Sequence, residues 1–371
     1  MNAFTAYVVF AMLLILLHFP VAWPQSATET TPQISKGRVF NPDISANFLG
    51  LLQRGSNLSE DRTQVPHNGF SLQEAELQFS SDVDVYFRGV VRLGIAQESG
   101  ATDYGIDPEE VYLETITLPH VTLRAGHFKM ALGKHNLLHT HAFPFIDAPL
   151  IYQQLVGDEG LNEAAVSTAI LIPTSWYSEI VLQGISLANE NLFQSPSSGQ
   201  TGALAHLKNL WDLTDDLTLE LGCSGITGKN QFDKTSTLLA GDLTLKWRPA
   251  VGGKYHAFIW SNEFLDGKRK GLTDATTGEQ TEHLGGMASW IQYQFAARWW
   301  IQTRYEYLGL PHPSSIPFQN KWSALLGFFP SEFSGIRFQY DNLQTQGQAK
   351  EDHTFTLQFN VSIGAHPAHA Y

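Results

Sequence analysis

The stretch TFTLQFNVSI at 354–363 alternates polar and apolar side chains without a break. Its apolar members all stand at odd positions: Phe355, Leu357, Phe359, Val361 and Ile363. A period of two is typical of a β-strand with one apolar and one polar face, whereas an amphipathic helix repeats about every 3.6 residues. The stretch therefore predicts a strand that separates an apolar environment from a polar one.

The same alternation recurs upstream and predicts sixteen strands in total. We expect them at 44–53, 70–80, 83–97, 109–118, 121–130, 162–172, 177–188, 201–211, 215–227, 237–248, 254–265, 283–296, 298–308, 320–329, 332–343 and 351–363.

The connections between these strands alternate between short and long. The short ones are 81–82, 119–120, 173–176, 214–215, 249–253, 297 and 330–331. The long ones lie near 54–69, 98–108, 131–161, 189–200, 228–236, 266–282, 309–319 and 344–350. Outer-membrane barrels sort their loops in this way, and closing the sheet removes edges that lipid would not tolerate. The sequence predicts an all-β fold, a transmembrane antiparallel β-barrel of about 16 strands over residues 44–363.

Composition excludes several classes. Charged residues make up 16% and aromatic residues 12% of the 371, and the mean hydropathy is −0.14, which does not suit disorder, a coiled coil or a helical membrane protein. A net charge of −13 argues against a nucleic-acid partner. One cysteine, Cys223, excludes a disulfide scaffold and CxxC sites. HExxH, GxSxG and Walker A motifs are absent from the sequence, so we expect no enzyme.

Aromatic residues gather at the short-turn ends of the predicted strands. This group comprises Trp176, Tyr177, Trp211, Trp247, Trp299, Trp300, Phe328 and Phe329. Trp322 and Tyr340 stand toward the opposite ends. Amphipathic rings settle at membrane interfaces, so this placement predicts an aromatic girdle.

The N-terminus predicts export. Residues 7–17 (YVVFAMLLILL) form an apolar run of signal-peptide length that is too short to span a bilayer comfortably. We expect a signal peptide over 1–27 and a periplasmic lead over 28–43; a buried first helix is the alternative. The tail, 364–371, ends in Tyr371, which could serve as a terminal aromatic signal for the barrel assembly machinery.

The polar side chains that alternate with the apolar ones along each strand are expected to line a pore, because sixteen strands enclose more volume than side chains fill. The expected lining residues are Glu74, Glu76, Arg88, Arg92, Glu114, Arg124, Lys208, Arg304 and Arg337. The excess of acidic residues in the whole chain predicts a weak cation preference.

The connection 131–161 is the longest and most apolar of the set. An apolar loop has little reason to stay in water, so we expect it to fold into the barrel and narrow it. Six of its side chains could bind Zn²⁺ through imidazole and carboxylate: His135, His139, His141, Asp147, Asp158 and Glu159. Histidines bonded to backbone or carboxylates, without metal, are the alternative.

Six stretches carry a family resemblance: FSLQEAELQF (70–79), VGDEGLN (156–162), HLKNLWDLTDDLTLELG (206–222), DLTLKWRP (242–249), FFPSEFSGIRFQY (328–340) and GAHPAHAY (364–371). With them the chain resembles the outer-membrane porin-like barrels of the phosphate-selective porin O/P-type superfamily, and more narrowly barrels described as zinc-regulated outer-membrane receptors. The resemblance implies passive or substrate-linked uptake, and the narrower one implies a link to zinc supply. Phosphate-type pores are lined by arginine and lysine, which this acidic chain offers sparingly.

The predicted function is a channel in the outer membrane of a Gram-negative bacterium for passive diffusion of small hydrophilic solutes or ions, with no cofactor. The expected partners are outer-membrane lipids, the barrel assembly machinery, the solutes and, by analogy, two further copies in a homotrimer. A second interpretation is a zinc-linked uptake protein that uses the loop histidines. A third is a membrane-embedded hydrolase or a structural barrel.

Overall fold

The computed structural model describes residues 42–193, 200–230, 232–274, 278–311 and 314–364. The predicted signal peptide (1–27), most of the predicted lead (28–43) and all but the first residue of the predicted tail (364–371) lie outside these ranges. Within the described residues, no helix is both long and apolar enough to cross a membrane.

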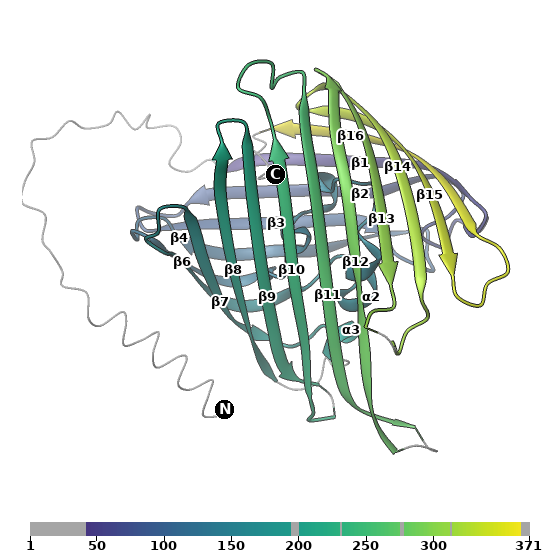
Figure 1. Cartoon of the computed structure of the whole chain (residues 1–371), viewed down its shortest axis with the longest axis horizontal. Coiled ribbons are helices and arrows are strands. Elements are labelled where there is room, and N and C mark those ends of the chain that lie inside the picture. The colour runs from purple at the N-terminus through teal and green to yellow at the C-terminus, as the bar shows by residue number, and fades with distance from the viewer. Residues whose placement is uncertain (1–41, 194–199, 231, 275–277, 312–313, 365–371) are drawn as a thin grey trace, which may run out of the picture. The chain divides into compact units, whose positions relative to one another are not determined.

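Sixteen antiparallel strands follow one another around a closed barrel, and β1 pairs with β16 to complete the ring (Figure 1). The strands are β1 (Asp43–Gly55), β2 (Gly69–Asp82), β3 (Phe87–Gln97), β4 (Tyr104–Thr115), β5 (Val121–Lys129), β6 (Asn162–Leu171), β7 (Tyr177–Ser186), β8 (Thr201–Thr214), β9 (Leu217–Lys229), β10 (Thr235–Trp247), β11 (Ala257–Asp274), β12 (Gly278–Ala296), β13 (Trp299–Leu308), β14 (Gln319–Ser331), β15 (Ser334–Thr345) and β16 (Asp352–Gly364). The predicted all-β, sixteen-stranded antiparallel barrel is confirmed.

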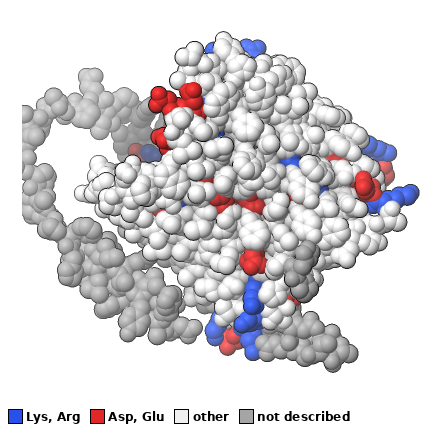
Figure 2. All heavy atoms as spheres, in the orientation of Figure 1, with Lys and Arg blue, Asp and Glu red and all other residues white. Residues whose placement is uncertain are grey.

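The alternation in β16 separates the two faces of the barrel wall. Phe355, Phe359 and Ile363 are exposed, whereas Thr356 and Gln358 are buried. In β16 the outward face is therefore apolar and the inward face polar. Figure 2 shows an outer face that is mostly uncharged, with most of its basic side chains toward the margins.

Aromatic rings pair at both ends of the barrel wall. Near the short turns, the ring centroids of Trp176 and Trp211 lie 6.1 Å apart. Near the long loops, those of Tyr305 and Trp322 lie 4.5 Å apart. These pairs sit where interfacial aromatic belts form in membrane barrels.

The prediction of a long loop at 266–282 is wrong for most of these residues, which belong to strands. β11 runs to Asp274 and β12 starts at Gly278, so the two strands continue past their neighbours as a ribbon (Figure 1). Arg269 and Glu282 face each other across this ribbon, with Nη2 2.5 Å from Oε2. This ribbon lies beyond the closed wall and needs no apolar face, so the alternation that marks the other strands is missing here.

Two other boundaries differ from the prediction by more than three residues. β4 begins at Tyr104 rather than 109, which shortens the preceding connection to residues 98–103. β3 begins at Phe87 rather than 83, because Asp84 Oδ1 accepts the backbone N–H groups of Tyr86 (2.7 Å) and Phe87 (2.9 Å). Such an aspartate-centred turn ends the preceding pairing.

The connection between β5 and β6 is packed inside the barrel. It contains two 3₁₀ turns, η1 (His135–Leu137) and η2 (Thr140–Ala142), and the helix α2 (Leu150–Val156). A further short helix, α3 (Glu190–Phe193), packs against α2 from the connection between β7 and β8. The fully buried side chains of the connection between β5 and β6 form the apolar centre of the structure: Met130, Leu132, Phe145, Ile151, Tyr152, Leu155 and Leu161. We call residues 130–161 the interior loop.

Candidate functional site

One carboxylate fastens the interior loop to the barrel wall. Asp147 accepts hydrogen bonds from Arg304 Nη2, which lies 2.8 Å from both carboxylate oxygens, from Gln339 at 2.7 Å, and from Lys321. Arg304 is 1% exposed and also pairs with Glu306 at 2.8 Å. Burial alone would raise the pKa of Asp147, but Arg304 and Lys321 hold that pKa well below its ordinary value.

Strand side chains also satisfy the backbone of the interior loop. Buried peptide groups need hydrogen-bond partners, and a loop folded into a barrel cannot find them in water. Five backbone N–H groups of the loop donate to strand side chains: Ala131 to Gln183 (3.0 Å), Gly133 to Ser224 (2.9 Å), His135 to Glu263 (2.8 Å), Ile146 to Gln339 (2.8 Å) and Leu150 to Glu306 (2.5 Å). These acceptors come from β7, β9, β11, β13 and β15, so the loop is held mainly by the second half of the barrel.

The open space lies on the other side of the interior loop. A polar cavity of about 900 Å³ is bounded by the loop and by strands β1–β8. Six basic and three acidic side chains line it: Arg88, Arg92, Arg124, Lys129, Lys134, Lys208, Glu110, Glu114 and Glu179. A smaller space of about 370 Å³, of mixed charge, lies beyond Lys134 and is lined by Glu220, Lys246, Arg248 and three aspartates.

The structure divides the predicted pore-lining residues into two groups. Arg88, Arg92, Glu114, Arg124 and Lys208 line the cavity. Glu74, Glu76, Arg304 and Arg337 are buried instead. Arg337, for example, donates to the backbone oxygen of Phe143 at 2.6 Å, so it holds the loop rather than facing open space.

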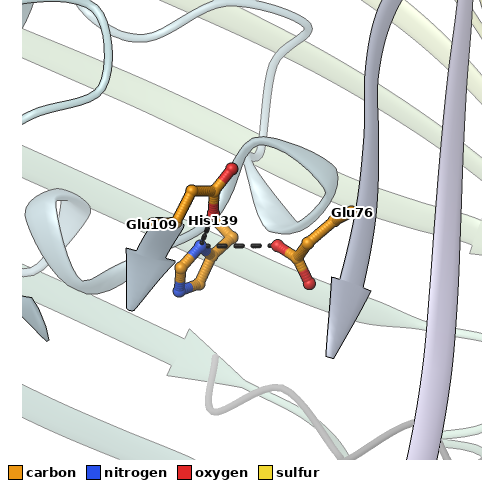
Figure 3. Close-up of side chains that lie close together, drawn as sticks. All are labelled: Glu76, Glu109 and His139. Atoms are coloured by element: carbon orange, nitrogen blue, oxygen red, sulfur yellow. Dashed lines mark hydrogen bonds and ion pairs between the residues drawn. The ribbon is translucent and has the colours of Figure 1, made fainter. Parts of the chain in front are cut away.

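Two of the three loop histidines reach a carboxylate cluster. His139 Nδ1 lies 2.9 Å from Glu109 Oε2 and 3.4 Å from Glu76 Oε2 (Figure 3). On the other edge of the ring, Nε2 lies 3.1 Å from Glu110 Oε2. His141 Nδ1 lies 3.3 Å from Glu76 Oε2. One ligand atom from each of Glu76, Glu109 and His139 lies within 4.8 Å of the other two, so a metal ion could bind between them.

The other predicted metal ligands do not join this group. His135 is enclosed by aromatic rings, with Phe143 at 4.4 Å and Tyr152 at 5.1 Å between centroids. Asp147 is engaged by Arg304 and Lys321, and Asp158 and Glu159 are exposed. The six predicted ligands therefore do not converge.

Glu109 is the cluster member that the period-two pattern misses. Adjacent strand residues point to opposite faces, so Glu109 and Glu110 should not both face inward. The register shifts here, with Arg92 opposite Glu110 and Leu93 opposite Pro108, so Glu109 is the extra residue of a β-bulge. Pro108 was the available signal, because proline in a strand is confined to edges and bulges.

A serine–histidine pair also occurs inside the barrel. His206 Nδ1 lies 2.7 Å from Ser224 Oγ, the arrangement that a hydrolase would need. Both side chains are buried, and Ser224 Oγ accepts the N–H of Gly133. Neither residue lines the 900 Å³ cavity, and Ser224 holds the backbone of the interior loop at Gly133.

The buried His135 predicts a loss of stability in mild acid. Burial, with Arg304 and Lys129 nearby, lowers the pKa of His135 from 6.5 to about 3. The unfolded chain then binds a proton that the folded chain does not, so stability is full above about pH 6.5 and falls as pH drops toward 3. Between about pH 7 and pH 5 the loss is roughly 2 kcal/mol.

The substitution His135→Phe should remove this loss, because the two ring nitrogens have no hydrogen-bond partner and a phenyl ring keeps the aromatic packing. Urea unfolding at the two pH values measures it, with the exposed His353→Phe as control. An equal pH dependence in wild type and His135→Phe would contradict the assignment.

Comparison with known proteins supports the fold. No family model matches the sequence. An uncharacterized protein from Aquifex aeolicus (strain VF5) is 27% identical over 398 residues, which cover 90% of this chain and 81% of that protein.

Among solved structures, the trimer form of OmpT, an outer membrane protein of Vibrio cholerae, gives a TM-score of 0.57 at 9% identity and covers 87% of this chain and 99% of its own. The anion-selective porin from Comamonas acidovorans gives 0.55 at 8% identity, covering 87% and 98%. OprB of Pseudomonas putida gives 0.53 at 8%, covering 87% and 94%. The chain thus has the sixteen-stranded fold of outer-membrane porins.

Proposed function

We propose that this protein is an outer-membrane channel for the passive diffusion of small hydrophilic solutes, narrowed by its interior loop. The observation that supports this most directly is the polar cavity of about 900 Å³ beside a loop fastened to the opposite wall. An anchored loop fixes the bore, and a polar lining keeps water inside. The process selects solutes by size and charge and requires no covalent step.

We further propose that the narrow part of the lumen prefers anions. In two of its ion pairs the basic partner is the more exposed one: Arg124 is 32% exposed against 18% for Glu114, and Lys208 is 32% against 11% for Glu220. Arg88 and its partner Asp82 are about equally exposed, at 47% and 53%. A solute in the cavity therefore meets positive charge first. The net charge of the whole chain pointed to cations, but charge outside the lumen acts on permeating ions only weakly because salt screens it.

Planar-bilayer recording of the purified protein tests the channel. Stable conductance steps are expected, and their reversal potential in a salt gradient should indicate anion preference. Folded protein without conductance would reject the channel and leave a structural barrel or an enzyme.

Location and partners follow from the same proposal. The apolar exterior and the aromatic pairs at both ends suit direct contact with outer-membrane lipids in a Gram-negative bacterium. Assembly would require the barrel assembly machinery. A homotrimer is compatible with the trimer form of the structurally similar OmpT; cross-linking in native membranes would measure the number of copies.

A further inference from the structure

We propose that Glu76, Glu109 and His139 form a binding site for a divalent transition-metal ion, such as Zn²⁺, on the wall of the lumen. The three ligands come from β2, from the bulge of β4 and from the interior loop (Figure 3). One nitrogen and two carboxylate oxygens are a donor set that Zn²⁺ accepts, with a water molecule free to complete the tetrahedron. The proposal rests on the position of the loop and not on conductance.

The cluster gathers more carboxyl groups than arginine and lysine side chains that pair with them. Four carboxylates gather there: Glu74, Glu76, Glu109 and Glu110. Among the ion pairs of the described residues, Arg92 is the one arginine or lysine that pairs with them, contacting Glu76 at 3.3 Å and also Glu110. Buried charges are paired or coordinate metals, because an unpaired one loses its hydration. A divalent cation would supply the missing charge.

Two buried carboxylate oxygens lack hydrogen bonds. Glu76 is 1% exposed, and its Oε2 has no well-aligned hydrogen bond; its nearest partners are His141 Nδ1 at 3.3 Å and His139 Nδ1 at 3.4 Å. Glu74 Oε1 is likewise buried without a hydrogen-bond partner. A buried oxygen of this kind has lost its hydration without gaining a hydrogen bond, and a metal–oxygen bond would offset that loss.

The orientation of the His139 ring also suits a ligand. Its Nε2 edge faces Glu110 and Arg92, and its Nδ1 edge faces Glu109 and Glu76. In the tautomer that donates Nε2–H to Glu110, the Nδ1 lone pair faces two carboxylates and is available to a cation. In the other tautomer, Nε2 accepts from Arg92 and Nδ1–H donates to Glu109, so binding a metal ion selects the first. Metal-binding histidines are oriented in this way, with the second nitrogen donating to a carboxylate.

The backbone is shaped to let Glu109 reach the group. Gly94 lies opposite Glu76 on the neighbouring strand, and the Glu109 side chain crosses it. A Cβ added at Gly94 would stand 2.4 Å from Glu109 Oε1. The cavity gives an ion access from water, because His139, His141 and Glu110 all line it.

Zinc titration of the full chain, purified from membranes in detergent, tests the site. Isothermal calorimetry should give one Zn²⁺ per chain, and Co²⁺ in its place should show the visible absorption of a nitrogen- and oxygen-ligated ion. Glu109→Gln and His139→Ala should each weaken binding at least about tenfold. The matched controls are Glu159→Gln and His353→Ala, which change the same residue types outside the group.

A third variant guards against misfolding of the first two. Gly94→Ala keeps every ligand and should still weaken binding by displacing Glu109, with an unchanged circular dichroism spectrum. No saturable binding to folded wild type would overturn the proposal and leave His139 as a hydrogen-bond partner of the carboxylates. Equal binding in wild type, Glu109→Gln and His139→Ala would also overturn it. Conductance plays no part in these readouts, so the site can fail while the channel stands.

Discussion

Replacing Asp147 with alanine is expected to release the interior loop, raise the single-channel conductance and lower the free energy of unfolding by about 3 kcal/mol. The substitution removes the acceptor of Arg304, Lys321 and Gln339 at once. Removing one partner of a buried ion pair commonly costs about 3–5 kcal/mol, and the lower end applies because Glu306 remains 2.8 Å from Arg304.

Bilayer recording and urea unfolding in lipid vesicles measure the two effects of Asp147→Ala. Asp158→Ala is the matched control, since it removes an exposed aspartate from the same loop. A conductance equal to that of wild type would show that Asp147 does not hold the loop in its narrowing position.

The second large effect is expected from the double substitution Arg124→Glu and Lys208→Glu. Both side chains line the cavity. Arg124 is more exposed than its partner Glu114, and Lys208 is more exposed than its partner Glu220. Charge reversal leaves those carboxylates beside new ones, so the field in the lumen changes sign. We expect the reversal potential in a salt gradient to change sign too, from anion to cation preference.

Arg54→Glu is the control for this experiment. Arg54 pairs with Glu60 near the first long connection, and its side chain is 73% exposed, so salt should screen its effect. If the Arg124→Glu, Lys208→Glu protein kept the selectivity of wild type, the basic lining would not determine ion preference.

The sequence by itself determined the barrel. The period-two alternation at 354–363, the sorting of turns by length and the aromatic pairs near the short turns are local patterns, because an apolar outer face imposes them residue by residue. Where the closed wall ends, the same patterns fail: the ribbon of β11 and β12 beyond Leu265 was predicted as loop. The inward bulge at Glu109 breaks the alternation from within a strand.

Only the tertiary structure decided the site. Asp147 meets Arg304 across 157 residues, and His139 meets Glu109 across 30, so no local pattern links them. The same holds for charge, because the sequence gives one net value whereas folding chooses which groups face the cavity. His135 and His139 are the same residue type in the same loop. The packing of that loop nevertheless buries His135 among aromatic rings and places His139 among carboxylates. Local hydropathy determines a barrel wall, and long-range packing determines what its interior can bind.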